Sequence, residues 1–258
     1  MWSKYKNFLG TLLFVLILLM IWQILALNPE ISKKFSSPYE VISTLITELL
    51  KNNLLNHVFY SYINITIGFI IGNLIGALLG TLFWLNENLG KIVNPVLFLL
   101  SSIPVFAIAP MTILWWGAGD FAKIMIVFLH VFFVAIFYTY KSIGEIREEL
   151  FSFFRNYVGM NNFQAFIHII LPSYIIWLPN MLKFTVSFAV LGEFVAEFIV
   201  SDKGIGHYII KATGLYDVPK VLVGIIFLML YPFLINSLLN IYKNYIKRKF
   251  SSSTENIL

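Results

Sequence analysis

Three ionisable side chains lie inside a long apolar segment, and they are the first candidates for chemistry in this chain. Lys183, Glu193 and Glu197 all fall within residues 172–200. Charged groups at membrane depth are costly and usually face protein or water. Glu193 and Glu197 are four residues apart, so they share one helix face, where two close carboxylates disfavour joint ionisation. The spacing leaves two interpretations open: a proton or cation relay, or a pathway-facing or interhelical hydrogen bond near the outer surface.

The other reactive residue types form no catalytic or metal-binding pattern. The chain has no cysteine and four histidines. His130 stands alone in an apolar segment, where we expect an interhelical hydrogen bond, and no H-x-x-x-H or H-E-x-x-H spacing occurs. Neither G-x-x-x-x-G-K-[ST] nor G-x-S-x-G is present. We therefore expect no metal, no bound cofactor and no enzymatic activity in this chain, and any ATP hydrolysis would need a separate subunit.

These side chains must be positioned by membrane helices. The 258 residues are 59% hydrophobic and only 12% charged, which is about half the charge of a typical soluble domain. An apolar run of about 20 residues is long enough to cross the hydrocarbon core as a helix. The sequence predicts an all-α integral membrane protein with six transmembrane helices, at residues 8–27, 59–85, 93–116, 121–140, 172–200 and 221–242.

The basic residues set the expected orientation. The net charge is +5, which we attribute to cytoplasmic Lys and Arg beside a lipid bilayer and not to a nucleic-acid partner. The strongest cluster is Lys247-Arg248-Lys249, directly after the last span. We expect both termini in the cytoplasm, with an N-terminal segment over 1–7, one transmembrane domain over 8–250 and a disordered tail over 251–258. The first apolar run should be a retained helix, because residues 24–27 make a poor signal-peptide cleavage site.

Two stretches outside the spans carry amphipathic patterns. Ser37 and Glu40 form a capping box with Pro38 at the first helical position. A short amphipathic helix should follow, lying on the outer membrane surface or packed against the spans. Between spans four and five, residues 141–171 carry two apolar sets on either side of Gly159. Two short helices around a glycine would suit docking to another protein, and a plain solvated loop is the other interpretation.

The second span has a ladder of small residues on one face, at Gly68, Gly72, Gly76 and Gly80. Missing side chains let another helix approach closely, which favours association in lipid. Ser61 and Asn64 extend the same face. We expect close helix packing here, against either this chain or a second copy of it.

Two stretches resemble the permeases of ATP-binding-cassette importers. The loop before the fifth span ends in G-x(9)-I-x-L-P, beginning at Gly159, which resembles half of their cytoplasmic coupling motif. That motif normally opens with Glu-Ala-Ala, and this chain lacks the acidic residue there. The residues that the resemblance assigns to ATPase coupling are Phe153, Phe154, Arg155, Gly159, Ile169, Leu171 and Pro172.

The second stretch, residues 103–117, resembles the third-span signature of the nitrate/sulfonate/taurine branch of those permeases. That branch also contains permeases for thiamine-pyrimidine and riboflavin-type substrates. These permeases also carry an A-E…G-[LI]-G pattern, which residues 196–197 and 204–206 match. They carry Arg or Lys at the position that residue 183 occupies here. The resemblance implies translocation-path or gating roles for Pro104, Pro110, Trp115, Lys183 and Glu197.

The resemblance implies a type I importer permease in a bacterial inner membrane. Its implied partners are a second copy of the chain, a cytoplasmic ATPase dimer that would hold ATP and Mg, and an extracytoplasmic solute-binding protein. The solute would be a sulfonate-, taurine- or nitrate-type anion, or a pyrimidine- or flavin-type vitamin precursor. The alternative function is a proton-coupled secondary transporter with Glu193, Glu197 and Lys183 as its relay. Dependence of uptake on ATP or on the proton gradient separates the two.

Overall fold

A computed structural model describes residues 2–51, 54–145, 159, 161, 164 and 166–255 of the chain. The regular elements within these residues are all helical, which confirms the all-α part of the expected fold class. They are α1 (Trp2–Leu25), α2 (Pro29–Phe35), α3 (Pro38–Lys51), α4 (Leu54–Leu85), α5 (Glu87–Ser101), α6 (Val105–Trp116), α7 (Asp120–Glu145), a π-helical turn (Phe166–Ile170), α10 (Leu171–Ile199), α11 (Ile205–Gly214) and α12 (Val218–Glu255).

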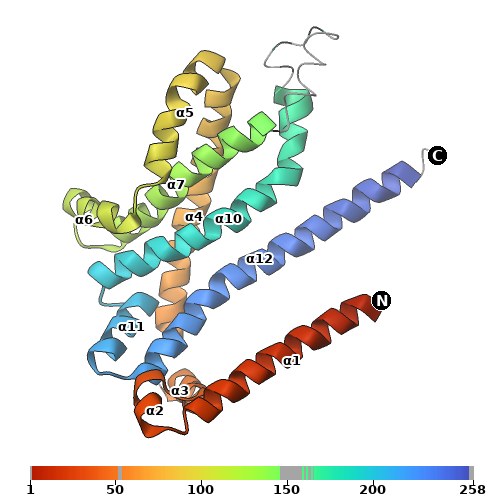
Figure 1. Ribbon diagram of the computed structural model, residues 1–258. Helices are drawn as coiled ribbons and strands as arrows, with labels where there is room; N and C mark the ends of the chain where they lie inside the picture. The colour runs from red at the N-terminus through yellow and green to blue at the C-terminus, as the bar shows by residue number, and fades with distance from the viewer. Residues whose placement is uncertain are drawn as a thin grey trace.

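The core of the bundle consists of α4, α7 and α10, with α12 alongside (Figure 1). One cluster of buried side chains contains residues from all four helices: Ile65, Phe69, Val127, Val131, Val186, Ala189 and Tyr231. The close approach of α4 to α7 follows from the glycine ladder. A Cβ atom placed on Gly68 would lie 2.6 Å from Cγ1 of Val127, and one placed on Gly76 would lie 2.6 Å from Cβ of Ala135. The structure therefore places the partner of the ladder within the same chain.

Three described helices are long and apolar enough to cross a membrane: Leu54–Leu85, Asp120–Gly144 and Val218–Ile246. A fourth candidate is the pair Asn88–Ser101 and Val105–Trp116, whose axes are bent by 93° at a short break. Residues 8–27 and 172–200, expected as the first and fifth spans, fold as α1 and α10. Their crossing of the membrane, and with it the six-span count, stays a prediction.

The bend separates α5 from α6, where a single span over 93–116 is expected from the sequence. Pro104 is the residue before α6, with an extended backbone at φ −61° and ψ 132°. Proline has no N–H to donate and disfavours helical geometry in the residue before it, so the helix cannot run on through Ile103. The apolar run alone gives no sign of the break, whereas the proline does.

The Ser37–Glu40 capping box is present at the start of α3. The backbone N–H of Ser37 donates to Oε2 of Glu40 at 3.0 Å, and that of Glu40 donates to Oγ of Ser37 at 3.2 Å. A further hydrogen bond, from Oγ of Ser36 at 2.7 Å, holds the pKa of Glu40 below its usual value. Val41 of α3 is buried against α4, α11 and α12, while Ile42 and Ile46 are exposed. Thus α3 packs against the bundle with one side of its apolar stripe and leaves the other uncovered.

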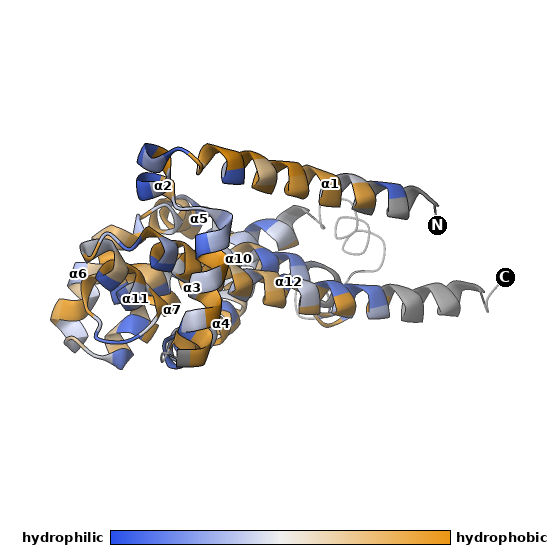
Figure 2. Cartoon of the chain, turned by 90° about the horizontal axis from the view of Figure 1, so that it is seen from below, coloured by the Kyte–Doolittle hydropathy of each residue, from blue (hydrophilic) through white to orange (hydrophobic). Residues whose placement is uncertain are grey.

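Helix α1 lies apart from the bundle and meets it at one end through α2 and α3 (Figures 1 and 2). Its side chains are apolar over most of its length and largely exposed, as expected for a helix in contact with lipid. The N- and C-terminal ends of the chain point toward the same side of the molecule (Figure 1). Their placement in the cytoplasm stays a prediction. Helix α12 continues to Glu255, so residues 251–255 are helical where a disordered tail is expected from the sequence.

Candidate functional site

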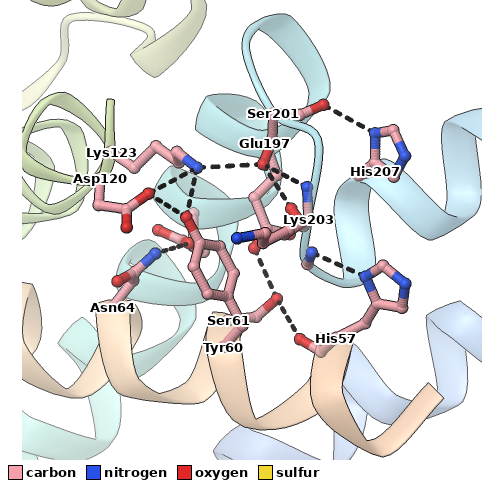
Figure 3. A network of polar contacts seen from close by, with 12 residues as sticks. His57, Tyr60, Ser61, Asn64, Asp120, Lys123, Glu197, Ser201, Lys203 and His207 are labelled. Carbon is pink, nitrogen blue, oxygen red and sulfur yellow. Dashed lines mark hydrogen bonds and ion pairs between the residues drawn. The ribbon is translucent and has the colours of Figure 1, made fainter. Parts of the chain in front are cut away.

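The carboxylate of Glu197 is the centre of a buried polar network that joins α4, α10 and α11 (Figure 3). Its side chain is 0% exposed. Oε1 accepts a hydrogen bond from Oγ of Ser61 at 2.6 Å, and Oε2 accepts one from the backbone N–H of Gly206 at 2.6 Å. Of the two interpretations of Glu197, the interhelical hydrogen bond is the one that this geometry supports.

The network satisfies the first N–H groups of α11, which have no partner within the helix itself. The N–H of Gly204 donates to Nδ1 of His57 at 3.0 Å, and the N–H of Ile205 donates to Oγ of Ser61 at 2.8 Å. With the bond from Gly206 to Glu197, three consecutive backbone donors bind side chains of α4 and α10. A negative charge at a helix N-terminus is also favoured by the helix dipole. Helix α11 is therefore held at one end by the helices of the core.

Glycine is required at the N-cap of α11 and at the second residue of the helix because Glu197 lies so close. A Cβ atom on Gly204 would fall 1.8 Å from Oε1 of Glu197, and one on Gly206 would fall 2.7 Å from its Cβ. Gly204 also has φ +102°, which side chains rarely adopt. This accounts physically for the sequence pattern in which A-E is followed by G-I-G.

Glu193 lies one turn before Glu197 on α10 and is also 0% exposed. Its Oε1 accepts a hydrogen bond from Nδ2 of Asn64 at 2.9 Å. Its Oε2 has no hydrogen-bond partner among the described residues. The two acidic residues therefore bind the same face of α4 through Ser61 and Asn64, which continues the face of the glycine ladder.

A buried lysine on α7 extends the network, and its burial is not predictable from the residue pattern around it. Lys123 is only 4% exposed. Its Nζ lies 3.1 Å from Oδ1 of Asp120 and donates to the hydroxyls of Tyr60 at 2.6 Å and Ser201 at 3.1 Å. The Tyr60 hydroxyl in turn donates to Asp120. Figure 3 shows these groups converging from α4, α7 and the end of α10, so the network fixes four helices relative to one another.

Lys183 lies elsewhere and contacts a different helix. Its Nζ donates to Oδ1 of Asn240 on α12, and Lys243 on α12 donates to Asn180 on α10. These reciprocal pairs join α10 to α12. Lys183 is fourteen residues from Glu197 on the same helix, about 21 Å along the axis. The structure therefore does not bring Lys183 together with the two acidic residues that were grouped with it.

The residues of the third-span signature lie on α6. Pro104 precedes the helix, and Pro110 lies within it. Trp115 is 61% exposed, and its ring meets that of Trp116 edge to face at 5.5 Å between centroids. The exposed side chain of Trp115 on α6 can therefore contact a partner or a solute. Glu197, in contrast, is buried among helices of its own chain.

The coupling segment is described in part. Phe153, Phe154 and Arg155 lie outside the described residues. Gly159 has φ +68°, the left-handed region that favours glycine. Asn161 and Gln164 then exchange two hydrogen bonds in a capping-box pattern, at 2.9 and 2.8 Å. The chain passes through the π-helical turn, which contains Ile169, into α10 at Leu171 and Pro172.

No group of three or more His, Asp or Glu side chains suited to a metal ion occurs among the described residues. The chemistry of the network is that of neutral and charged hydrogen bonds between helices. Such an arrangement can couple the positions of helices, and it offers no reactive centre within the part that the structure describes.

Comparison with known proteins gives consistent matches. The family model described as "Binding-protein-dependent transport system inner membrane component" matches residues 72–252. The formylaminopyrimidine transport permease of Halalkalibacterium halodurans is 30% identical over 221 residues, covering 84% of this chain and 86% of the relative. The putative aliphatic sulfonates transport permease of Bacillus subtilis is 27% identical over 227 residues, covering 86% and 81%. The riboflavin transport system permease of Chloroflexus aurantiacus is 32% identical over 143 residues, covering 55% and 51%.

Proposed function

Because the chain belongs to the family of binding-protein-dependent transport system inner membrane components, and is thus a permease subunit of an ATP-binding-cassette importer in a bacterial inner membrane, we propose that it forms the translocation path for a small organic solute. The observation that carries this is the extent of the family match. Residues 72–252 include the C-terminal part of α4, all of α5 to α11 and nearly all of α12. The family also implies partnership with an ATPase and an extracytoplasmic binding protein.

Two copies of the chain would form the path, with ATP and Mg bound by the partner ATPase. The alternation between inward- and outward-facing states needs two arrangements that ATP and solute favour differently. Segment 141–171 would contact the ATPase, with Gly159 forming the turn between its two halves.

Helix α10 is suited to carry the movement. It contains 29 consecutive helical residues, with Pro179 among them, about 44 Å of helix. One end begins at the Leu171-Pro172 end of the coupling segment. The other end carries Glu197, which binds the N-terminus of α11. A displacement of α10 at the ATPase would therefore move α11 with it, and we propose that α11 is part of the gate on that side.

The solute belongs to one of two chemical classes in this proposal. The relatives are named for a formylaminopyrimidine, for aliphatic sulfonates and for riboflavin. The first and third are planar heterocycles, and the second is a flexible organic anion.

The proposal is tested by reconstituting the chain with its ATPase and binding protein in proteoliposomes loaded with ATP. Uptake of a labelled probe is measured with and without an ionophore that collapses the proton gradient. We expect uptake to require ATP and to be unchanged by the ionophore. An ATPase subunit without its phosphate-loop lysine is the control, and should abolish uptake. Uptake that stops with the ionophore and continues with the inactive ATPase would overturn the proposal.

A further inference from the structure

A cavity of about 520 Å³ lies where α5, α7 and α10 meet. Aromatic side chains form most of its wall: Phe137 and Tyr138 from α7, and Phe184 and Phe188 from α10. Three polar residues line it as well: Ser101 at the end of α5, and Lys141 and Ser142 near the end of α7. None of these lining residues belongs to the buried network of Glu197.

Three of the four aromatic rings that line this cavity contact one another in series, and the fourth contacts a ring outside the lining. The rings of Tyr138 and Phe184 are 5.6 Å apart between centroids with planes at 32°, and those of Phe184 and Phe188 are 5.2 Å apart at 57°. Phe98 on α5 contacts Phe137 at 5.7 Å. Aromatic pairs favour offset or edge-to-face contact at about 4.5–7 Å between centroids. A planar aromatic ligand can therefore contact both faces and edges of rings in this wall.

The polar groups of the cavity are few and include one cation. Nζ of Lys141 lies 5.9 Å from the ring centroid of Phe137, and an ammonium group can donate three hydrogen bonds. The hydroxyl of Ser101 donates to the carbonyl of Phe98 at 2.9 Å, so its lone pairs can accept from a guest. Donors and acceptors are therefore both available in a wall that is otherwise apolar.

This composition separates the two solute classes. A small aliphatic sulfonate can pair with Lys141, but it has no flat face to bury against the four aromatic rings of the wall. A planar heterocycle instead buries its faces against the rings and directs its ring nitrogens and carbonyl oxygens to Lys141 and the serines. A second cavity, of about 420 Å³ between α4 and α10, is lined by Phe69, Leu74, Leu78 and neighbouring residues without any charged side chain. It is suited to lipid chains and offers no comparable polar edge.

We infer that the cavity between α5, α7 and α10 is a contact site for the transported solute, and that this solute is a planar nitrogen heterocycle with polar edge groups. The inference rests on the proposed function, since it takes the chain to be the translocation subunit. It goes further by selecting one of the two solute classes and by naming the residues that hold it.

The test uses the complete importer in proteoliposomes and three labelled probes: formylaminopyrimidine, riboflavin and ethanesulfonate. Phe184→Leu removes one ring of the cavity, and Phe198→Leu is its matched control. Both phenylalanines lie on α10 and both are 49% exposed, but Phe198 does not line the cavity. Because the loss of one aromatic contact is worth about 0.5–1.5 kcal/mol, we expect Phe184→Leu to lower the heterocycle transported per ATP hydrolysed by about two- to tenfold. Phe198→Leu should leave this ratio unchanged.

A second variant distinguishes the solute classes at the same site. Lys141→Gln keeps a hydrogen-bond donor and removes the charge, so it should affect uptake of a heterocycle less than Phe184→Leu does. The inference is overturned if ethanesulfonate accumulates and neither heterocycle does, if no probe accumulates, or if Phe184→Leu behaves like Phe198→Leu. Co-purification of the ATPase and ATP hydrolysis by the complex are measured in parallel. If these remain normal, the failure concerns the cavity alone, whereas their loss in the unmodified complex would count against the proposed function itself.

Discussion

The backbone N–H of Gly206 lies 2.6 Å from Oε2 of Glu197, across the turn that joins α10 to α11. The other carboxylate oxygen accepts from Ser61 on α4. One side chain therefore connects three helices, and its substitution should show whether its charge or its hydrogen bonds matter.

We expect Glu197→Gln to be tolerated and Glu197→Leu to be destabilising. The amide oxygen of Gln can accept from Gly206, and its NH₂ can donate to Ser61, whose own hydroxyl can then donate to the carbonyl of His57, 3.1 Å away. Leu leaves the buried N–H of Gly206 unpaired, at a cost of about 1–3 kcal/mol. Thermal unfolding in detergent and ATP-dependent uptake measure the two effects. Equal losses for Gln and Leu would show that the negative charge itself is needed.

Gly204→Ala should damage the protein more than the same change at Gly117. Both glycines have positive φ with ψ near 180°, at φ +102° and +80°, a region that is essentially restricted to glycine, so both substitutions introduce backbone strain of about 1–3 kcal/mol. Only at Gly204 does the new Cβ also collide with Glu197, whereas nothing lies within 4 Å at Gly117. We expect Gly117→Ala to fold with slightly lowered stability, and Gly204→Ala to lose α11 anchoring and transport. Similar melting temperatures for the two variants would contradict the close approach of Gly204 to Glu197.

The sequence contains enough to predict which faces of α4 and α10 are buried. The glycine ladder, Ser61 and Asn64 follow one face of α4, and Glu193 and Glu197 follow one face of α10. The spacing alone therefore predicts that each of these faces contacts another helix. That the two faces meet was not predictable, because Ser61 and Glu197 are 136 residues apart. The helix that packs against the glycine ladder was not predictable either, because Val127 and Ala135 are ordinary apolar residues in the sequence.

Lys123 and α11 show two further limits of sequence reasoning. Lys123 stands near the start of an apolar run and looks like a flanking charge, but Tyr60 and Ser201 from distant segments enclose it. Helix α11 is only ten residues long, too short to give a clear periodic signal and held in place by partners from α4 and α10. Pro104 differs from these two examples. A proline at this position indicates a helix break, although the hydropathy of the segment is continuous.

The contact between Gly76 and Ala135 predicts a compensating pair of substitutions. Gly76→Ala places a Cβ 2.6 Å from that of Ala135, 3.0 Å from the carbonyl oxygen of Phe132 and 3.2 Å from the nitrogen of Ile136. We expect a loss of about 1–3 kcal/mol from overpacking. Ala135→Gly removes the nearest atom and should recover part of this loss in the double variant, while the backbone contacts remain.

The measurement is thermal unfolding of the purified chain, with Gly10→Ala as the control. None of the described residues lies within 4 Å of a Cβ at Gly10, so this change should not lower stability. Because the partner of Gly76 is within the chain, the effect should appear in the permease alone, before any assembly with other subunits. Additive effects in the double variant would contradict direct contact between the two positions.

The backbone of Gly159 predicts which residues the coupling segment accepts there. Its φ is +68°, and none of the described residues lies within 4 Å of a Cβ built on it, so the backbone conformation is the limit on substitution that the described part of the chain sets. Asn adopts this region more readily than most residues, whereas a β-branched side chain is strongly disfavoured in it. We therefore expect Gly159→Asn to retain coupled transport and Gly159→Val to lose most of it, although both proteins insert in the membrane. Uptake per ATP hydrolysed and co-purification with the ATPase are the measurements. If Val retains both, the turn at Gly159 is not required for coupling; if Asn loses both as fully as Val, side-chain size at this surface matters and the conformational argument is wrong.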